Sequence, residues 1–123
     1  MALTRRVFPL VLLLGLGLAF GPRAVAHALV IEASPAIDSS VTGPGVEFVL
    51  RFNSRLDRDR SRLILIGPDG VNRRLSVSHD SSLDTLKANA SALAPGSYKL
   101  RWQVLAIDGH ITRGDIPFRI TPP

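Results

Sequence analysis

The stretch whose side chains are best suited to bind a ligand or do chemistry is Asp108-Gly109-His110, in which one glycine separates a carboxylate from an imidazole. It follows a run from Tyr98 to Ala106 in which apolar and polar residues alternate, a pattern typical of a half-buried strand. If that strand stays extended, Asp108 and His110 continue its core-facing series, because residues i and i+2 point to the same side. The glycine would let both side chains converge at the rim of the core. Because Asp-x-His alone is a weak signal, a site here needs a further donor.

The beginning of the chain predicts a targeting segment. Arg5 and Arg6 precede an apolar run from Val7 to Phe20 that is short for a bilayer span and is followed by small residues. We expect a cleaved signal peptide over residues 1–26 and one domain over residues 27–123. Export by the Sec route, or by the twin-arginine route that the adjacent arginines also fit, gives a periplasmic protein whose mature form is not membrane-anchored.

Two cleavage sites satisfy the small-x-small rule. Cleavage after Ala26 leaves His27 as the first residue, whereas cleavage after Ala28 discards it. In the first case the α-amine and imidazole of His27 can chelate one metal ion. Together with Asp108 and His110 they form a donor set of two imidazoles, one amine and one carboxylate. This set suits tetragonal Cu(II), with tetrahedral Zn(II) as the alternative.

Composition narrows the function further. The full chain has a net charge of +5, but residues 27–123 keep 12 of the 15 Lys and Arg residues and all 10 acidic residues, which gives +2. Such a small surplus gives little support for nucleic-acid binding. There is no cysteine, and the only methionine is Met1. The processed chain therefore has no disulfide and no sulfur ligand, which excludes a soft Cu(I) site.

The predicted domain consists of short segments in which apolar and polar residues alternate, and it shows no sustained helical periodicity. We predict strands over residues 27–34, 46–52, 63–66, 71–78, 85–90, 98–107 and 115–121. About seven strands separated by turns indicate an all-β, immunoglobulin-like sandwich with Greek-key connections.

Several local features can be assigned within this fold. By parity, His27 shares the core-facing side of its strand with Leu29 and Ile31. We expect the mixed charges of residues 53–62 to form a solvated loop, and Pro68-Asp69-Gly70 to form a hairpin turn. Tyr98, just after Pro-Gly, is expected to form a tyrosine corner, and Trp102 to be a core aromatic. We expect His79, in a polar loop, to be exposed.

A set of motifs at fixed spacing spans the domain: His27-Ala28, Ser34-Pro35-Ala36, Leu50-Arg51-Phe52, and a C-terminal block with Leu93, Pro95-Gly96, Tyr98, Trp102, Val104, Asp108-Gly109-His110 and Gly114. Together they resemble the CopC family of periplasmic copper-binding proteins. The resemblance implies an immunoglobulin-like sandwich that binds Cu(II) through the mature N-terminal histidine and the Asp-x-His pair, which match His27, Asp108 and His110. It also implies a role in copper resistance or uptake, often beside an inner-membrane CopD-type protein. The match favours cleavage after Ala26.

Two departures from the family pattern refine this interpretation. The methionine-rich Cu(I) site of some members has no counterpart, which indicates a Cu(II)-only form. Many relatives carry Ser-Glu after the position of Phe52, where this chain has Asn53-Ser54. We therefore expect any role of that carboxylate to be lost.

The leading interpretation is a non-enzymatic periplasmic Cu(II) carrier or buffer for copper homeostasis. One alternative is a copper mono-oxygenase with an N-terminal histidine brace, against which a bound carboxylate and the small domain argue. The other is a metal-free immunoglobulin-like interaction module, because fold does not fix function. The sequence leaves import, export and buffering of copper open.

Overall fold

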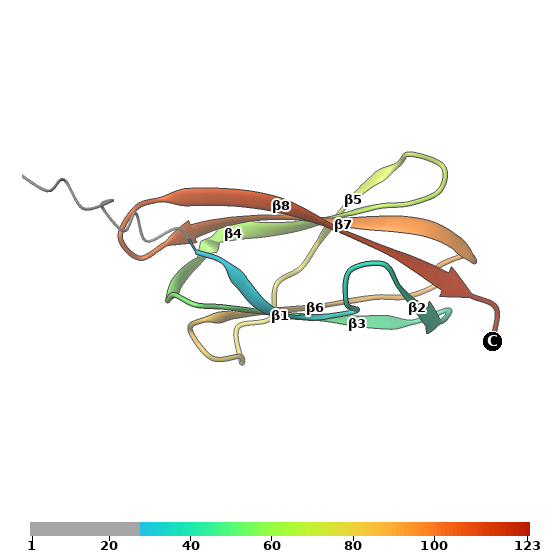
Figure 1. Ribbon diagram of the computed structural model, residues 1–123, viewed down its shortest axis with the longest axis horizontal. Coiled ribbons are helices and arrows are strands. Elements are labelled where there is room, and N and C mark those ends of the chain that lie inside the picture. The colour runs from blue at the N-terminus through green and yellow to red at the C-terminus, as the bar shows by residue number, and fades with distance from the viewer. Residues whose placement is uncertain (1–27) are drawn as a thin grey trace, which may run out of the picture.

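A computed structural model describes residues 28–123 as two β-sheets packed face to face (Figure 1). The predicted signal peptide and His27 lie outside these residues. Within residues 28–123 all eight elements are strands, and no helix there is long and apolar enough to cross a membrane. The predicted all-β sandwich is confirmed, with eight strands in place of about seven.

The smaller sheet has the spatial order β1-β3-β6 and is antiparallel throughout. Its strands are β1 (Val30–Ser34), β3 (Val46–Phe52) and β6 (Thr85–Ala90). The alternation in β3 turns Phe48 and Leu50 inward, and both side chains are fully buried.

The larger sheet has the order β2-β8-β7-β4-β5. Its strands are β2 (Ser39–Thr42), β8 (Ile111–Thr121), β7 (Gly96–Ala106), β4 (Leu56–Ile66) and β5 (Asn72–Leu75). β2 pairs in parallel with the end of β8, and the other ladders are antiparallel. The predicted hairpin is confirmed, because β4 and β5 are joined by a turn in which the Gly70 amide donates to the Gly67 carbonyl at 3.0 Å.

One core fills the space between the sheets. Edge-to-face contacts join Phe52 to Trp102 at 5.3 Å and Phe48 to Phe118 at 5.6 Å between ring centroids. The tyrosine corner is confirmed as well, since the Tyr98 hydroxyl donates to the Ala94 carbonyl at 2.6 Å. Within residues 28–123, the eight strands thus enclose a single hydrophobic core.

The expectation of a solvated loop over residues 53–62 is wrong, because β4 begins at Leu56. The ladder with β7 shifts register between Asp57 and Arg62, which gives a bulge. Buried Ser61 fills the gap: its hydroxyl donates to the Asp57 carbonyl and accepts from the Leu105 amide. Charged residues can therefore lie in a strand here because a hydroxyl completes the hydrogen bonds that the bulge interrupts.

Candidate metal centre

Asp108 and His110 lie in the turn that connects β7 to β8. The Gly109 amide donates to the Ala106 carbonyl at 2.9 Å, and the Ala106 amide donates to the His110 carbonyl at 2.8 Å. Gly109 has φ +92°, a conformation that favours glycine. The expectation that Asp108 and His110 extend the core-facing series is wrong, because the chain reverses directly after β7 and both residues are exposed.

The two side chains contact each other. His110 Nδ1 lies 3.1 Å from Asp108 Oδ2, and the side chains are 51% and 37% exposed, respectively. The His110 backbone amide also donates to Asp108 Oδ1 at 3.1 Å. This amide, and then the imidazole, hold the pKa of the Asp108 carboxyl below its usual value, because both stabilise the charged form. The turn thus presents an ionised carboxylate beside an imidazole at the surface.

The first described residues lie at the same end of the sandwich as this turn (Figure 1). The Thr112 hydroxyl donates to the Ala28 carbonyl at 3.0 Å. Because Thr112 comes two residues after His110 in the sequence, this bond holds Ala28 next to the β7–β8 turn. Leu29 and Asn53 exchange two hydrogen bonds: the Leu29 amide donates to Asn53 Oδ1 at 2.8 Å, and the Asn53 amide donates to the Leu29 carbonyl at 3.0 Å. The chain just after His27 is therefore held on two sides.

The loop that follows β3 joins these parts together. Asn53 holds Leu29, and two residues later the Arg55 carbonyl accepts a hydrogen bond from the Ile107 amide at 3.0 Å. This loop thus links the start of the described chain to the β7–β8 turn. The sequence interpretation missed the positioning roles of Asn53 and Thr112. The available signal was local: an amide side chain directly after a strand, and a hydroxyl next to the Asp-x-His segment, are side chains that bond readily to backbone.

The parity assigned to the first strand is wrong. Leu29 and Ile31 are 59% and 49% exposed, whereas Ala28 is only 1% exposed. The β1–β3 register shifts between Val30 and Glu32, so the strand does not alternate evenly through Ile31. Alternation along this strand therefore does not support a core-facing His27. The path of the chain here is instead defined by the hydrogen bonds of Ala28 and Leu29.

Among residues 28–123, no group of three or more His, Cys, Asp or Glu side chains is placed to hold a metal ion. Asp108 and His110, two of the three predicted ligands, lie within these residues and contact each other, and His27, the third, is outside them. His79 follows β5 in an exposed segment, as expected, and its Nδ1 lies 3.9 Å from Asp59 Oδ1.

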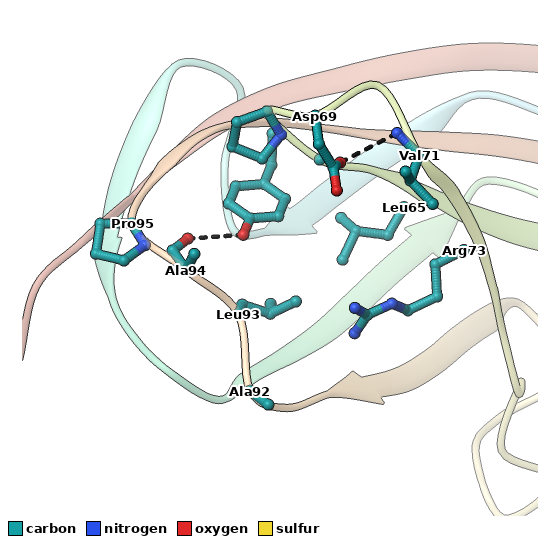
Figure 2. A pocket seen from close by; sticks show the side chains of 11 residues that line it. Leu65, Asp69, Val71, Arg73, Ala92, Leu93, Ala94 and Pro95 are labelled. Carbon is teal, nitrogen blue, oxygen red and sulfur yellow. Dashed lines mark hydrogen bonds between the residues drawn. The ribbon is translucent and has the colours of Figure 1, made fainter.

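A separate pocket of about 310 Å³ lies where β7 begins, between the β4–β5 turn and the segment that precedes β7 (Figure 2). Its polar side chains bond to nearby backbone: Asp69 Oδ1 accepts from the Val71 amide at 3.1 Å, the Tyr98 hydroxyl donates to the Ala94 carbonyl, and Arg73 donates to the Ser91 carbonyl at 3.4 Å. The Asp108–His110 pair follows the other end of β7, so the pocket and the pair lie at opposite ends of that strand.

Comparison with known proteins identifies the family. A family model described as the CopC domain matches residues 30–121. The chain belongs to the CopC domain family. The predicted resemblance is thereby confirmed, and the match covers all eight strands.

The individual relatives of this CopC-domain chain have low sequence identity to it. Protein YobA of Escherichia coli K12 is 28% identical over 102 residues, which cover 80% of this chain and 82% of YobA. The crystal structure of CopC from Methylosinus trichosporium OB3b has a TM-score of 0.70 at 26% identity, covering 78% of this chain and 95% of that protein. PcoC from Escherichia coli, described as a methionine-rich copper resistance protein, shares the fold, with a TM-score of 0.63 at 22% identity over 78% of this chain and all of PcoC.

Proposed function

We propose that this chain is a periplasmic Cu(II)-binding protein that carries or buffers copper in copper homeostasis, with Cu(II) bound by His27, Asp108 and His110. One observation carries the proposal: the chain directly after His27 is anchored to Thr112, beside an Asp108–His110 pair whose donor atoms already lie 3.1 Å apart. Consecutive Cα atoms are about 3.8 Å apart, so the anchor at Ala28 supports the proposal that His27 contributes donors beside the β7–β8 turn.

The spacing of the donor pair fits a metal ion. Two ligands about 2.0 Å from one ion at a right angle are roughly 2.8 Å apart, close to the 3.1 Å between His110 Nδ1 and Asp108 Oδ2. An amine and a second imidazole from His27 would complete a nitrogen-rich tetragonal set with one anionic oxygen. Because that set contains no sulfur, it favours Cu(II) over Cu(I).

Burial at Ala28 supports cleavage after Ala26. Ala28 is 1% exposed and belongs to the core cluster, and its carbonyl accepts the Thr112 hydrogen bond. Cleavage after Ala28 would remove this packing and would also discard His27. We therefore assign residues 1–26 to a signal peptide and residues 27–123 to the mature domain.

The physiological role rests on family membership together with the donor set. The similar solved proteins CopC and PcoC include one described as a copper resistance protein. An exposed site with mixed nitrogen and oxygen donors suits reversible uptake and release of Cu(II) without chemical turnover. The family resemblance makes an inner-membrane CopD-type protein the candidate partner for copper transfer.

A comparison of two histidine variants tests the proposal. With the chain beginning at His27, we expect one equivalent of Cu(II) to bind and to give a tetragonal, nitrogen-coordinated electron paramagnetic resonance spectrum. His110→Ala should lower Cu(II) affinity by about 100-fold or more, because it removes a ligand, whereas loss of a supporting group costs about 10–100-fold. His79→Ala is the matched control and should leave the affinity unchanged. Equal affinities for the two variants, or no copper signal from the starting protein, would refute the site and favour a metal-free module.

Asn53 should act on copper binding through the chain that it holds. Asn53→Ala removes the acceptor for the Leu29 amide, and we expect Cu(II) affinity to fall by about 10-fold as the N-terminal donors lose their fixed position. Stability should change by only about 1 kcal/mol. Asn89→Ala, on the exposed side of β6, is the control, and calorimetric titration of both variants provides the measurement. A normal affinity in Asn53→Ala would show that this anchor does not position a ligand.

A further inference from the structure

The outer face of the five-stranded sheet concentrates positive charge. Directly opposed residues of neighbouring strands point to the same side, so the register identifies this face. Arg74, Ile64, Arg101 and Asp115 form one row across it, and Arg62, Gln103 and Arg113 form the next. Its exposed cations are Arg62, Arg74, Lys99, Arg101, Arg113 and Arg119.

The net charge of this face is larger than the net charge of all the described residues together. The ladder positions on the face carry six cations and two carboxylates, Asp57 and Asp115, a surplus of four. Residues 28–123 together have a net charge of only +2, so the rest of the described chain is net negative. On the outer face of the smaller sheet, Glu32 and Glu47 balance Arg51 and Lys87. The surplus thus belongs to one side of the sandwich.

Contacts within the face neutralise only part of the charge. Arg101 lies 2.9 Å and Lys99 3.8 Å from the Asp115 carboxylate. Arg113 and Arg119, in contrast, donate to neutral oxygens, those of Gln103 at 2.8 Å and Ser97 at 2.7 Å. These bonds hold the guanidinium groups in ordered positions without cancelling their charge.

The composition of the face indicates the kind of partner. Specific protein interfaces are enriched in aromatic side chains at their centre, but the aromatic residues of the described chain all lie in the core: Phe48, Phe52, Tyr98, Trp102 and Phe118. An array of guanidinium groups on a broad sheet instead matches the repeated phosphates of lipid headgroups, to which arginine bonds through two N–H groups at once. We propose that this face docks the protein onto an anionic phospholipid bilayer.

Docking would set the orientation of the candidate copper site. β7 and β8 contribute Lys99, Arg101, Arg113 and Arg119 to the face, and the Asp108–His110 turn connects the same two strands. A protein lying with this face on a bilayer keeps that turn beside the membrane surface. Docking and copper binding use different residues, so each can be tested without the other.

Vesicle co-sedimentation of residues 27–123, which contain every core residue of the described chain, tests the proposal. We expect binding to vesicles of phosphatidylglycerol and phosphatidylethanolamine at low salt. The protein should not bind phosphatidylcholine vesicles, and its binding to the anionic vesicles should be lost at about 0.5 M NaCl, where screening is strong. The triple variant Arg62→Gln/Arg74→Gln/Arg119→Gln should bind at least about 10-fold more weakly, because each basic residue near an anionic surface adds to the attraction.

A charge-matched variant distinguishes this face from net charge alone. Arg51→Gln/Arg73→Gln/Lys87→Gln removes the same charge at positions away from the face and should keep most of the vesicle binding. Equal losses in the two triple variants, or binding to neutral vesicles, would overturn the proposal. Failure to bind anionic vesicles would also overturn it and would leave an acidic protein surface as the occupant. Thermal unfolding and Cu(II) titration should match the unsubstituted protein in both variants, and His110→Ala should bind vesicles normally.

Discussion

A processed protein that retains Ala26 is expected to bind Cu(II) about 100-fold more weakly, or worse, than one that begins at His27. The extra residue converts the α-amine of His27 into an amide, which can bind a metal ion only after it loses its proton. The chelate of amine and imidazole is then lost, although every residue of the predicted set is still present. Calorimetric titration, or competition with a chelator of known copper affinity, measures the difference.

The control for this experiment adds the same residue at the other end. An alanine after Pro123 changes length and composition identically and should leave Cu(II) affinity unchanged, because the C-terminus lies at the opposite end of the sandwich from the β7–β8 turn (Figure 1). If retention of Ala26 had no effect, the amine would be removed from the donor set. Binding would then have to rest on Asp108, His110 and the His27 imidazole alone.

The fold class could be predicted because its main signal is local. The period-two pattern in β3, β6 and β7 is continuous, and each of these strands appears close to its predicted range. β2 was missed because Ser39–Thr42 lies in a Ser-, Thr-, Gly- and Pro-rich segment, and it is a strand because its backbone pairs with β8. The first half of β4 was missed because its charged residues resemble a loop. In both cases long-range pairing overrides local preference.

The candidate site, too, has a part that the sequence could predict and a part that it could not. Asp108 and His110 are separated by one residue, so their contact could be inferred from spacing alone. The anchors of the N-terminal segment join residues that are distant in the chain: Leu29 and Asn53 are 24 positions apart, and Ala28 and Thr112 are 84 apart. No pattern in a single sequence reports such pairs. The wrong parity of Leu29 and Ile31 has a related cause, since one register shift reverses the face of every preceding residue.

The second large effect is expected at Gly114, which faces Trp102 across the β7–β8 ladder. A Cβ atom at Gly114 would lie 2.5 Å from Trp102 Cζ2 and 2.6 Å from Cε2. The indole cannot easily move away, because it is buried and packs edge-to-face against Phe52. We expect Gly114→Ala to lower the free energy of unfolding by about 1–3 kcal/mol, the usual cost of overpacking. For a domain of this size, each kcal/mol lowers Tm by roughly 4–8 °C.

Gly45→Ala provides the matched control, because the nearest atom to its added Cβ is the Ala90 carbonyl oxygen at 3.9 Å, an ordinary contact. A second test removes the obstacle itself. In a Trp102→Phe background the second ring of the indole is absent, so Gly114→Ala should cost clearly less than it does beside tryptophan. The difference between the two costs is the coupling energy of the pair. Equal destabilisation by Gly45→Ala and Gly114→Ala, or a coupling energy of zero, would show that the two strands do not pack through this contact.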